Sequence, residues 1–302
     1  MKKFINFYFS GKHVHLEWLC IKILLIGFWL KTILIQINTL KEIPIPIGVC
    51  KMISCEFFTN SWVSLFCVIL ILFFSIFYIL EKRMVVTTLI IFSMSLLFFT
   101  IEESNGIFER RGLYTFLFFA QFIAYLFSAL KFPEFNLNKY RIQFSVQVIA
   151  IGYTLSGLSK LYNSGIFWIT DGTRMPLQIL KSFYSNYTDN GKTTFLDQGN
   201  EIAQFIDSHS YLIYFVLATS LLLELGAISV IFFSRKYILI YGILLYCMHL
   251  GINTVMKIEI LSIMLPMIIL FINPLFIVLM ILYFIYSQYK KKSIEPELTN
   301  FR

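Results

Sequence analysis

Three ionisable residues lie inside long apolar segments of this chain and could carry chemistry. Lys160 stands in Gly-Leu-Ser-Lys-Leu, Glu224 in Leu-Leu-Leu-Glu-Leu-Gly, and His249 in the middle of a later segment. A charged side chain at the centre of a bilayer costs about 2.5–3.5 kcal/mol on insertion scales, so each is a functional candidate that needs a partner. Burial favours the neutral amine of a lysine, which can act as a base, and a neutral imidazole can pass a proton.

Each of these residues also has a structural interpretation, and the sequence leaves both open. Lys160 lies near the end of its segment, where a lysine can extend its ammonium to the lipid headgroups. Glu224 could be a buried polar tie between helices, with Lys160, His249 or Arg235 as its partner. His249 could serve only as a hydrogen bond between helices, and Asn253 shares its helix face four residues later.

Small residues precede Lys160 on the same predicted helix. Gly152, Ser156 and Gly157 recur at near-helical spacing. Small residues allow neighbouring helices to approach closely in a membrane. We therefore expect Lys160 to face other helices and not the lipid.

The segment that follows Lys160 mixes aromatic and polar residues. Residues 163–181 read NSGIFWITDGTRMPLQILK. The pattern predicts an interfacial or re-entrant piece between about 166 and 181, capped at Asp171 and anchored by Trp168. Asp171 and Arg174, three residues apart, could instead simply pair with each other.

The composition indicates that membrane-spanning helices position these residues. Hydrophobic residues make up 58% of the 302 residues and charged residues 14%, with a mean hydropathy of +0.76. A span needs about 20 apolar residues to cross a bilayer. We predict an all-α integral membrane protein with about eight transmembrane helices in one bundle. Its expected spans are 18–37, 61–80, 84–101, 113–130, 142–161, 211–233, 237–256 and 260–286.

The last apolar run contains Pro266 and the pair Asn273-Pro274. It therefore reads either as one kinked helix or as a span followed by a half-helix over 275–286 that doubles back. We expect a single membrane domain over 18–286, with a cytoplasmic segment 1–17 before it and a basic cytoplasmic tail 287–302 after it.

The charged residues predict the orientation of the chain. With a cytoplasmic N-terminus, fourteen Lys and Arg residues fall in inside segments and eight in outside segments. An excess of cations inside favours the N-in, C-in arrangement. The loop 162–210 then faces the outside, and Lys160 lies near the outer end of its span. The net charge of +8 follows this pattern of short loops and does not indicate nucleic acid.

Other polar residues within or between the spans add little chemistry. Lys22 and Lys31 in the first span either snorkel to the interface or line a lateral opening. Two of the four histidines lie in the N-terminal segment, so we expect no metal site. The cysteines of the spans are interpreted as apolar fillers, whereas Cys50 and Cys55 share a loop and could form a disulfide.

These residues together resemble the horizontally transferred transmembrane (HTTM) domain, which forms the membrane part of the vitamin K-dependent γ-glutamyl carboxylase family and also occurs as stand-alone bacterial proteins. The resemblance rests on the run from Gly157 through Trp168 to Gly172, on Leu-Glu-Leu-Gly around Glu224, and on His249. It covers residues 141–274 most specifically. In the carboxylase a lysine of this motif is thought to deprotonate a reduced quinone, and Lys160 occupies its position.

The resemblance implies lysine-base chemistry on a membrane quinol at the outer face, with Lys160, His249 and Glu224 as catalytic candidates. Ser159 replaces a second lysine of the carboxylase motif, and we expect no counterpart of the carboxylase's lumenal domain. Enzymatic action therefore stays open beside an alternative: a non-catalytic partner in the maturation or export of a secreted peptide, docking through 162–210. The candidate substrate- or lipid-binding residues are Gly157, Trp168, Asp171, Arg174 and Asn253.

Overall fold

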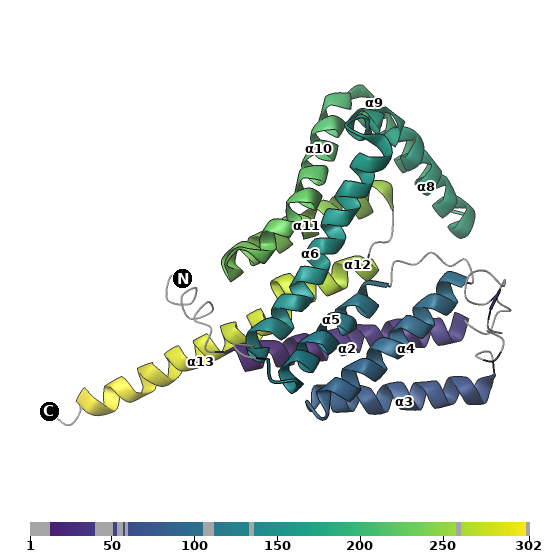
Figure 1. The fold of residues 1–302 in the computed structure, drawn as a ribbon. Coiled ribbons are helices and arrows are strands. Elements are labelled where there is room, and N and C mark those ends of the chain that lie inside the picture. Colours follow the sequence, from purple (N-terminus) through teal and green to yellow (C-terminus); the bar gives the residue numbers. More distant parts are fainter. Residues whose placement is uncertain are drawn as a thin grey trace. The chain divides into compact units, whose positions relative to one another are not determined.

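The computed structural model describes residues 13–39, 51–52, 57, 60–104, 112–132, 136–257 and 261–299. Every regular element within these ranges is a helix, and none of them is a strand (Figure 1). The chain divides into two compact units. Unit 1 comprises Met1–Ile142 with Ile268–Arg302, and unit 2 comprises Gln143–Met267.

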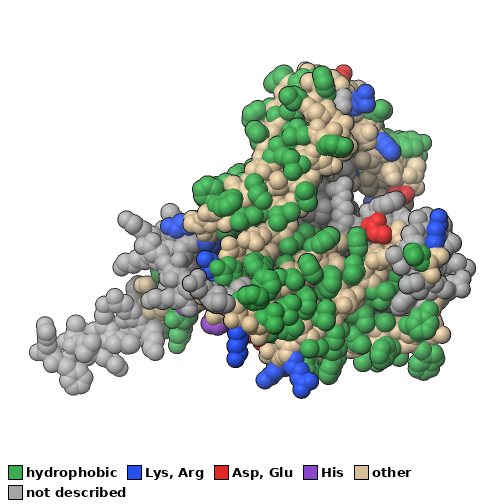
Figure 2. All heavy atoms as spheres, viewed as in Figure 1, with side chains coloured by type: hydrophobic (Ala, Val, Ile, Leu, Met, Phe, Trp, Pro, Cys, Tyr) green, Lys and Arg blue, Asp and Glu red, His purple; other side chains and the backbone are tan. Residues whose placement is uncertain are grey.

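Eight of the described helical segments are long and apolar enough to cross a membrane. They run over Val14–Ile35, Ser61–Ile79, Met84–Ile101, Gly112–Ala129, Leu137–Ser164, Ser210–Ile231, Arg235–Met256 and Met264–Tyr289. Figure 2 shows hydrophobic side chains over much of the visible face, with few charged ones among them. An exterior of this kind suits hydrocarbon and not water. The prediction of an all-α, multi-pass membrane protein is confirmed.

Unit 1 is built from α2 (Val14–Thr39), α3 (Ser61–Ile79), α4 (Met84–Ser104), α5 (Gly112–Ala129) and α13 (Pro274–Thr299), together with the first residues of α6 (Leu137–Ser164). Large aromatic residues fill the space between these helices. The Phe118 ring of α5 meets Trp29 of α2 edge-on at 5.2 Å and Tyr78 of α3 at 5.9 Å. Tyr78 also donates a hydrogen bond to the Gln121 side chain, so its buried hydroxyl is satisfied.

The last apolar run breaks where its prolines predict. Pro266 lies inside the short helix α12 (Leu261–Met267), the π-helical turn Ile268–Ile272 follows, and Asn273 has φ of +50°. Pro274 then begins α13, which suits its missing N–H. Because α13 continues without interruption to Thr299, residues 275–286 belong to one long helix and do not form a half-helix, and residues 287–299 are helical too.

Unit 2 contains the rest of α6, then α7 (Phe167–Thr170), the 3-10 turn Asp171–Arg174, α8 (Met175–Asn190), α9 (Thr194–Ser208), α10 (Ser210–Gly226), α11 (Arg235–Met256) and α12. The predicted outer loop 162–210 is therefore largely helical. Helices α8 and α9 form a hairpin whose turn is at Gly191, with φ of +68°. Its apolar faces enclose Ile179, Phe183 and Ile206, which contact Ile213 at the start of α10.

Candidate functional site

Lys160 and Glu224 form an ion pair between α6 and α10. The Lys160 Nζ atom donates to both carboxylate oxygens of Glu224, at 2.6 Å each. The Glu224 side chain is only 6% exposed, whereas that of Lys160 is 27% exposed. The carboxylate is thus almost fully removed from solvent, and the ammonium keeps one accessible side. This contact was one of the alternatives that the sequence left open.

Two neighbouring residues hold this pair in place. A Cβ atom on Gly157 would lie 3.2 Å from the Cβ of Glu224 and 3.0 Å from Leu225, so glycine lets α6 and α10 approach closely here and a larger residue would require these neighbours to shift. The Trp168 ring of α7 lies 4.7 Å from the Lys160 ammonium, within the range of a cation–π contact. The indole and the carboxylate therefore both bind the same ammonium.

Four residues before Gly157, and on the same face of α6, Tyr153 contacts His249 of α11. The Tyr153 hydroxyl and His249 Nε2 share a hydrogen bond of 2.6 Å, and the same hydroxyl lies 3.5 Å from the Met267 sulfur. Both side chains are buried. Tyr153 was not among the predicted site residues, because a tyrosine in a chain with 17 of them does not stand out.

The other residues predicted for the site do not contact the Lys160–Glu224 pair in any interaction described above. Arg174 and Asn253 are exposed, so Asn253 does not share the burial of His249. The side chain of Asp171 lies outside the described part of the structure, and its expected pairing with Arg174 stays a prediction. Gly152 and Ser156 are exposed, so of the three small residues before Lys160 only Gly157 lies in a helix contact.

A second charged cluster lies in unit 1. Lys22 Nζ donates to Glu81 Oε1 at 2.9 Å and to the Ile79 carbonyl at 2.8 Å, and Arg141 donates to the same Glu81 oxygen at 3.1 Å. The guanidinium also lies 4.9 Å from the Trp18 ring. Lys22 and Arg141 are 3% and 2% exposed. The prediction that Lys22 snorkels or lines an opening is wrong, because a carboxylate between α3 and α4 binds it inside the unit.

The environment of Glu81 shifts its pKa. Burial raises the pKa of the Glu81 carboxyl, but the hydrogen bond from Lys22 and the charges of Lys22 and Arg141 outweigh burial and bring the pKa below its ordinary value of 4.5. Glu81 therefore stays ionised and keeps both cations neutralised. Arg141 is one of the fourteen Lys and Arg residues counted above for the orientation, and no role was predicted for Glu81.

The described residues contain no cluster of three or more His, Cys, Asp or Glu side chains that could hold a metal ion. Cys20 and Cys67 are buried free thiols, as expected of fillers, and Cys247 is free and exposed. Cys50 and Cys55 lie outside the described residues, and their pairing stays a prediction.

Comparison of the chain with protein-family models, with curated proteins and with solved structures finds no match in any of the three. The fold and the membrane character therefore rest on the chain's own helices, and the candidate site rests on the geometry of Lys160, Glu224, Trp168, Tyr153 and His249.

Proposed function

We propose that this chain is an HTTM-type membrane protein that removes a proton from a hydroxyl of a membrane-borne substrate at the outer face of a bacterial inner membrane. The observation that supports this proposal is the Lys160–Glu224 pair, with its buried carboxylate and its partly accessible ammonium. Such a pair offers a proton donor and a proton acceptor to a single substrate oxygen.

The pair acts as one base, because the Lys160 Nζ atom contacts both carboxylate oxygens of Glu224 at 2.6 Å and a proton can pass directly between them. Transfer of a proton from Lys160 to Glu224 leaves a neutral amine beside a protonated carboxyl. The amine then takes the hydroxyl proton of the substrate and becomes an ammonium again. The resulting oxyanion lies beside that ammonium, which stabilises it. The substrate's proton is thus balanced by the proton now held on Glu224.

A membrane quinol is the substrate class that we propose. Its phenolic hydroxyl is acidic enough for an amine to deprotonate, and an ammonium flanked by a carboxylate suits a hydroxyl that both donates and accepts. Lys160 would hold the quinol oxygen, and Trp168 would limit the directions from which the ring can approach. When bound, the quinol supplies the oxyanion for later chemistry.

The experiment places the purified protein in lipid nanodiscs and adds a reduced naphthoquinol under anaerobic conditions across a pH series. The ultraviolet spectrum distinguishes quinol from quinolate. We expect wild type to yield quinolate at a lower pH than empty nanodiscs do, and Lys160→Gln and Glu224→Gln to abolish this difference. Lys192→Gln, which changes an exposed lysine at the α8–α9 turn, is the matched control and should behave as wild type. Identical spectra for wild type and empty nanodiscs would contradict the proposal.

A further inference from the structure

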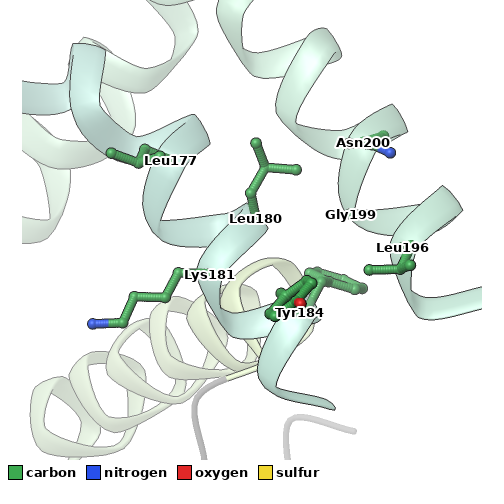
Figure 3. Close-up of a pocket in the computed structure, with 8 residues that line it drawn as sticks. Leu177, Leu180, Lys181, Tyr184, Leu196, Gly199 and Asn200 are labelled. Carbon is green, nitrogen blue, oxygen red and sulfur yellow. The ribbon is translucent and has the colours of Figure 1, made fainter. Parts of the chain in front are cut away.

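A cavity of about 330 Å³ lies between α8 and α9 (Figure 3), and neither Lys160 nor Glu224 lines it. Its volume is within the range of small-molecule sites in proteins. Leu177, Leu180, Phe183 and Tyr184 line it from α8, and Leu196 from α9. Figure 3 shows Leu180 between the two helices and Leu196 pointing toward Tyr184. The cavity is an apolar slot of a size that accommodates a hydrocarbon chain.

The packing of the hairpin creates this slot. A Cβ atom on Gly199 would lie 2.7 Å from the Cβ of Phe183, so glycine lets α9 rest directly on the phenylalanine. Phe183 is 1% exposed, and the Lys257 ammonium lies 5.6 Å from its ring. Phe183, one of the residues that line the slot, is therefore held by tight contacts.

The polar groups at the slot lie at its edge. Lys181, Gly199 and Asn200 complete the lining, and Figure 3 shows the Lys181 side chain extending away from α9. An apolar slot with an ammonium at its rim is complementary to an amphiphile that carries a negative head. A peptide would need more partners for its backbone polar groups than this lining provides.

The hairpin itself is suited to the surface of a bilayer. Its helices have 16 and 15 residues, too few to cross the hydrocarbon core. Leu177, Tyr184 and Phe205 are more than half exposed on helices that also present many polar side chains. Helices with such divided faces lie at the boundary between headgroups and acyl chains. Lipid is therefore the ligand available to the slot.

We propose that the slot between α8 and α9 binds one acyl chain of an anionic membrane phospholipid, with the Lys181 ammonium beside its phosphate. This binding site is separate from the Lys160–Glu224 pair and does not depend on the function proposed for that pair. It assigns to the hairpin a lipid ligand with a defined headgroup charge.

The experiment introduces a photo-crosslinking amino acid at Leu196, inside the slot, and separately at Phe215, which is 69% exposed on α10 and outside the slot. The protein is placed in nanodiscs with equal amounts of phosphatidylglycerol and phosphatidylcholine that carry identical acyl chains. Mass spectrometry then identifies the adducts. We expect phosphatidylglycerol to exceed phosphatidylcholine about fivefold at Leu196, as one lysine at a membrane surface would produce, and to equal it at Phe215.

Three variants test the mechanism of binding. Lys181→Gln should reduce the ratio at Leu196 to near one, whereas the matched Lys192→Gln should leave it unchanged. Leu180→Trp fills the slot and should abolish lipid adducts at Leu196 while those at Phe215 persist. Equal ratios at both positions in wild type would overturn the proposal. So would peptide adducts at Leu196 in protein purified from native membranes.

Discussion

Replacing either charged residue of the Lys160–Glu224 pair by a neutral one should lower the free energy of unfolding. Replacing both should lower it by less than the sum of the two single losses. Glu224→Gln removes the negative charge but keeps the shape, and Lys160 retains its partial exposure. We expect a loss of about 2 kcal/mol, between the values for surface pairs and fully buried pairs. Lys160→Met leaves Glu224, which is 6% exposed, without its cation. The expected loss is about 3 kcal/mol, because the carboxylate is the more deeply buried partner.

The double variant Lys160→Met/Glu224→Gln contains neither charge, so it should be no less stable than Lys160→Met alone. The resulting interaction energy is about 2 kcal/mol, well above the limit for independent sites. Equilibrium unfolding by SDS in mixed micelles measures each free energy, and Trp168 provides a fluorescent reporter beside the pair. Lys192→Met should change stability by less than about 0.5 kcal/mol. Single losses that simply add in the double variant would refute the ion pair.

Three further perturbations have definite expected outcomes. Gly157→Ala should destabilise by about 1–3 kcal/mol in the same assay by pushing α10 away, whereas Gly152→Ala, whose Cβ meets nothing within 4 Å, should be neutral or stabilising. Tyr153→Phe should cost about 1–2 kcal/mol because it removes the buried hydrogen bond between the Tyr153 hydroxyl and His249 Nε2, and a neutral result would contradict this hydrogen bond. The lowered pKa of Glu81 means that its contribution to the free energy of unfolding is complete above about pH 4.5 and is lost as the pH falls through the lower pKa of the folded state. Glu81→Gln should remove this acid dependence of stability, and an unchanged pH profile in the variant would disprove it.

The spans were predictable from the sequence because the thickness of a bilayer dictates the length of an apolar run. The predicted 84–101 agrees with the span Met84–Ile101, and most other boundaries differ by only a few residues. The helix α6 begins at Leu137, five residues before the predicted span. The prediction missed these first turns because they are polar and carry Arg141. A window that rewards hydropathy cannot recognise helical turns of this composition.

The predicted interfacial or re-entrant piece over 166–181 includes the start of α8, but the rest of α8 and all of α9 were missed because these helices do not span, so length and hydropathy did not mark them. Pro176 in the first turn of α8 and Gly191 at its end are the local signals that could have identified the first helix. The sequence described the same residues as a long polar loop. Amphipathic helices with exposed aromatic residues resemble loops in composition, and only their periodicity distinguishes them.

The candidate site was only partly predictable for a different reason. Hydrophobic segments made Lys160, Glu224 and His249 conspicuous, since a charge in a span needs a partner. Their pairing depends on which helices are adjacent, and sequence alone gave Glu224 three alternatives. Glu81 lies just outside a span, where a carboxylate is ordinary, so its role between two buried cations could not be recognised.

Unit 1 contains a contact between α2, near the start of the chain, and α13, near its end. Unit 1 can therefore be completed only after unit 2 has been synthesised. Cys20 of α2 packs against Phe276 and Met280, and the Asn273 amide donates to the Glu17 carbonyl at 3.1 Å. The first helix therefore meets its last partner only after more than 250 residues have been added. All of unit 2 is translated in that interval. Unit 2 is therefore fully synthesised before the core of unit 1 contains α13. Until α13 is made, the face of α2 that carries Cys20 contacts lipid or an insertion factor.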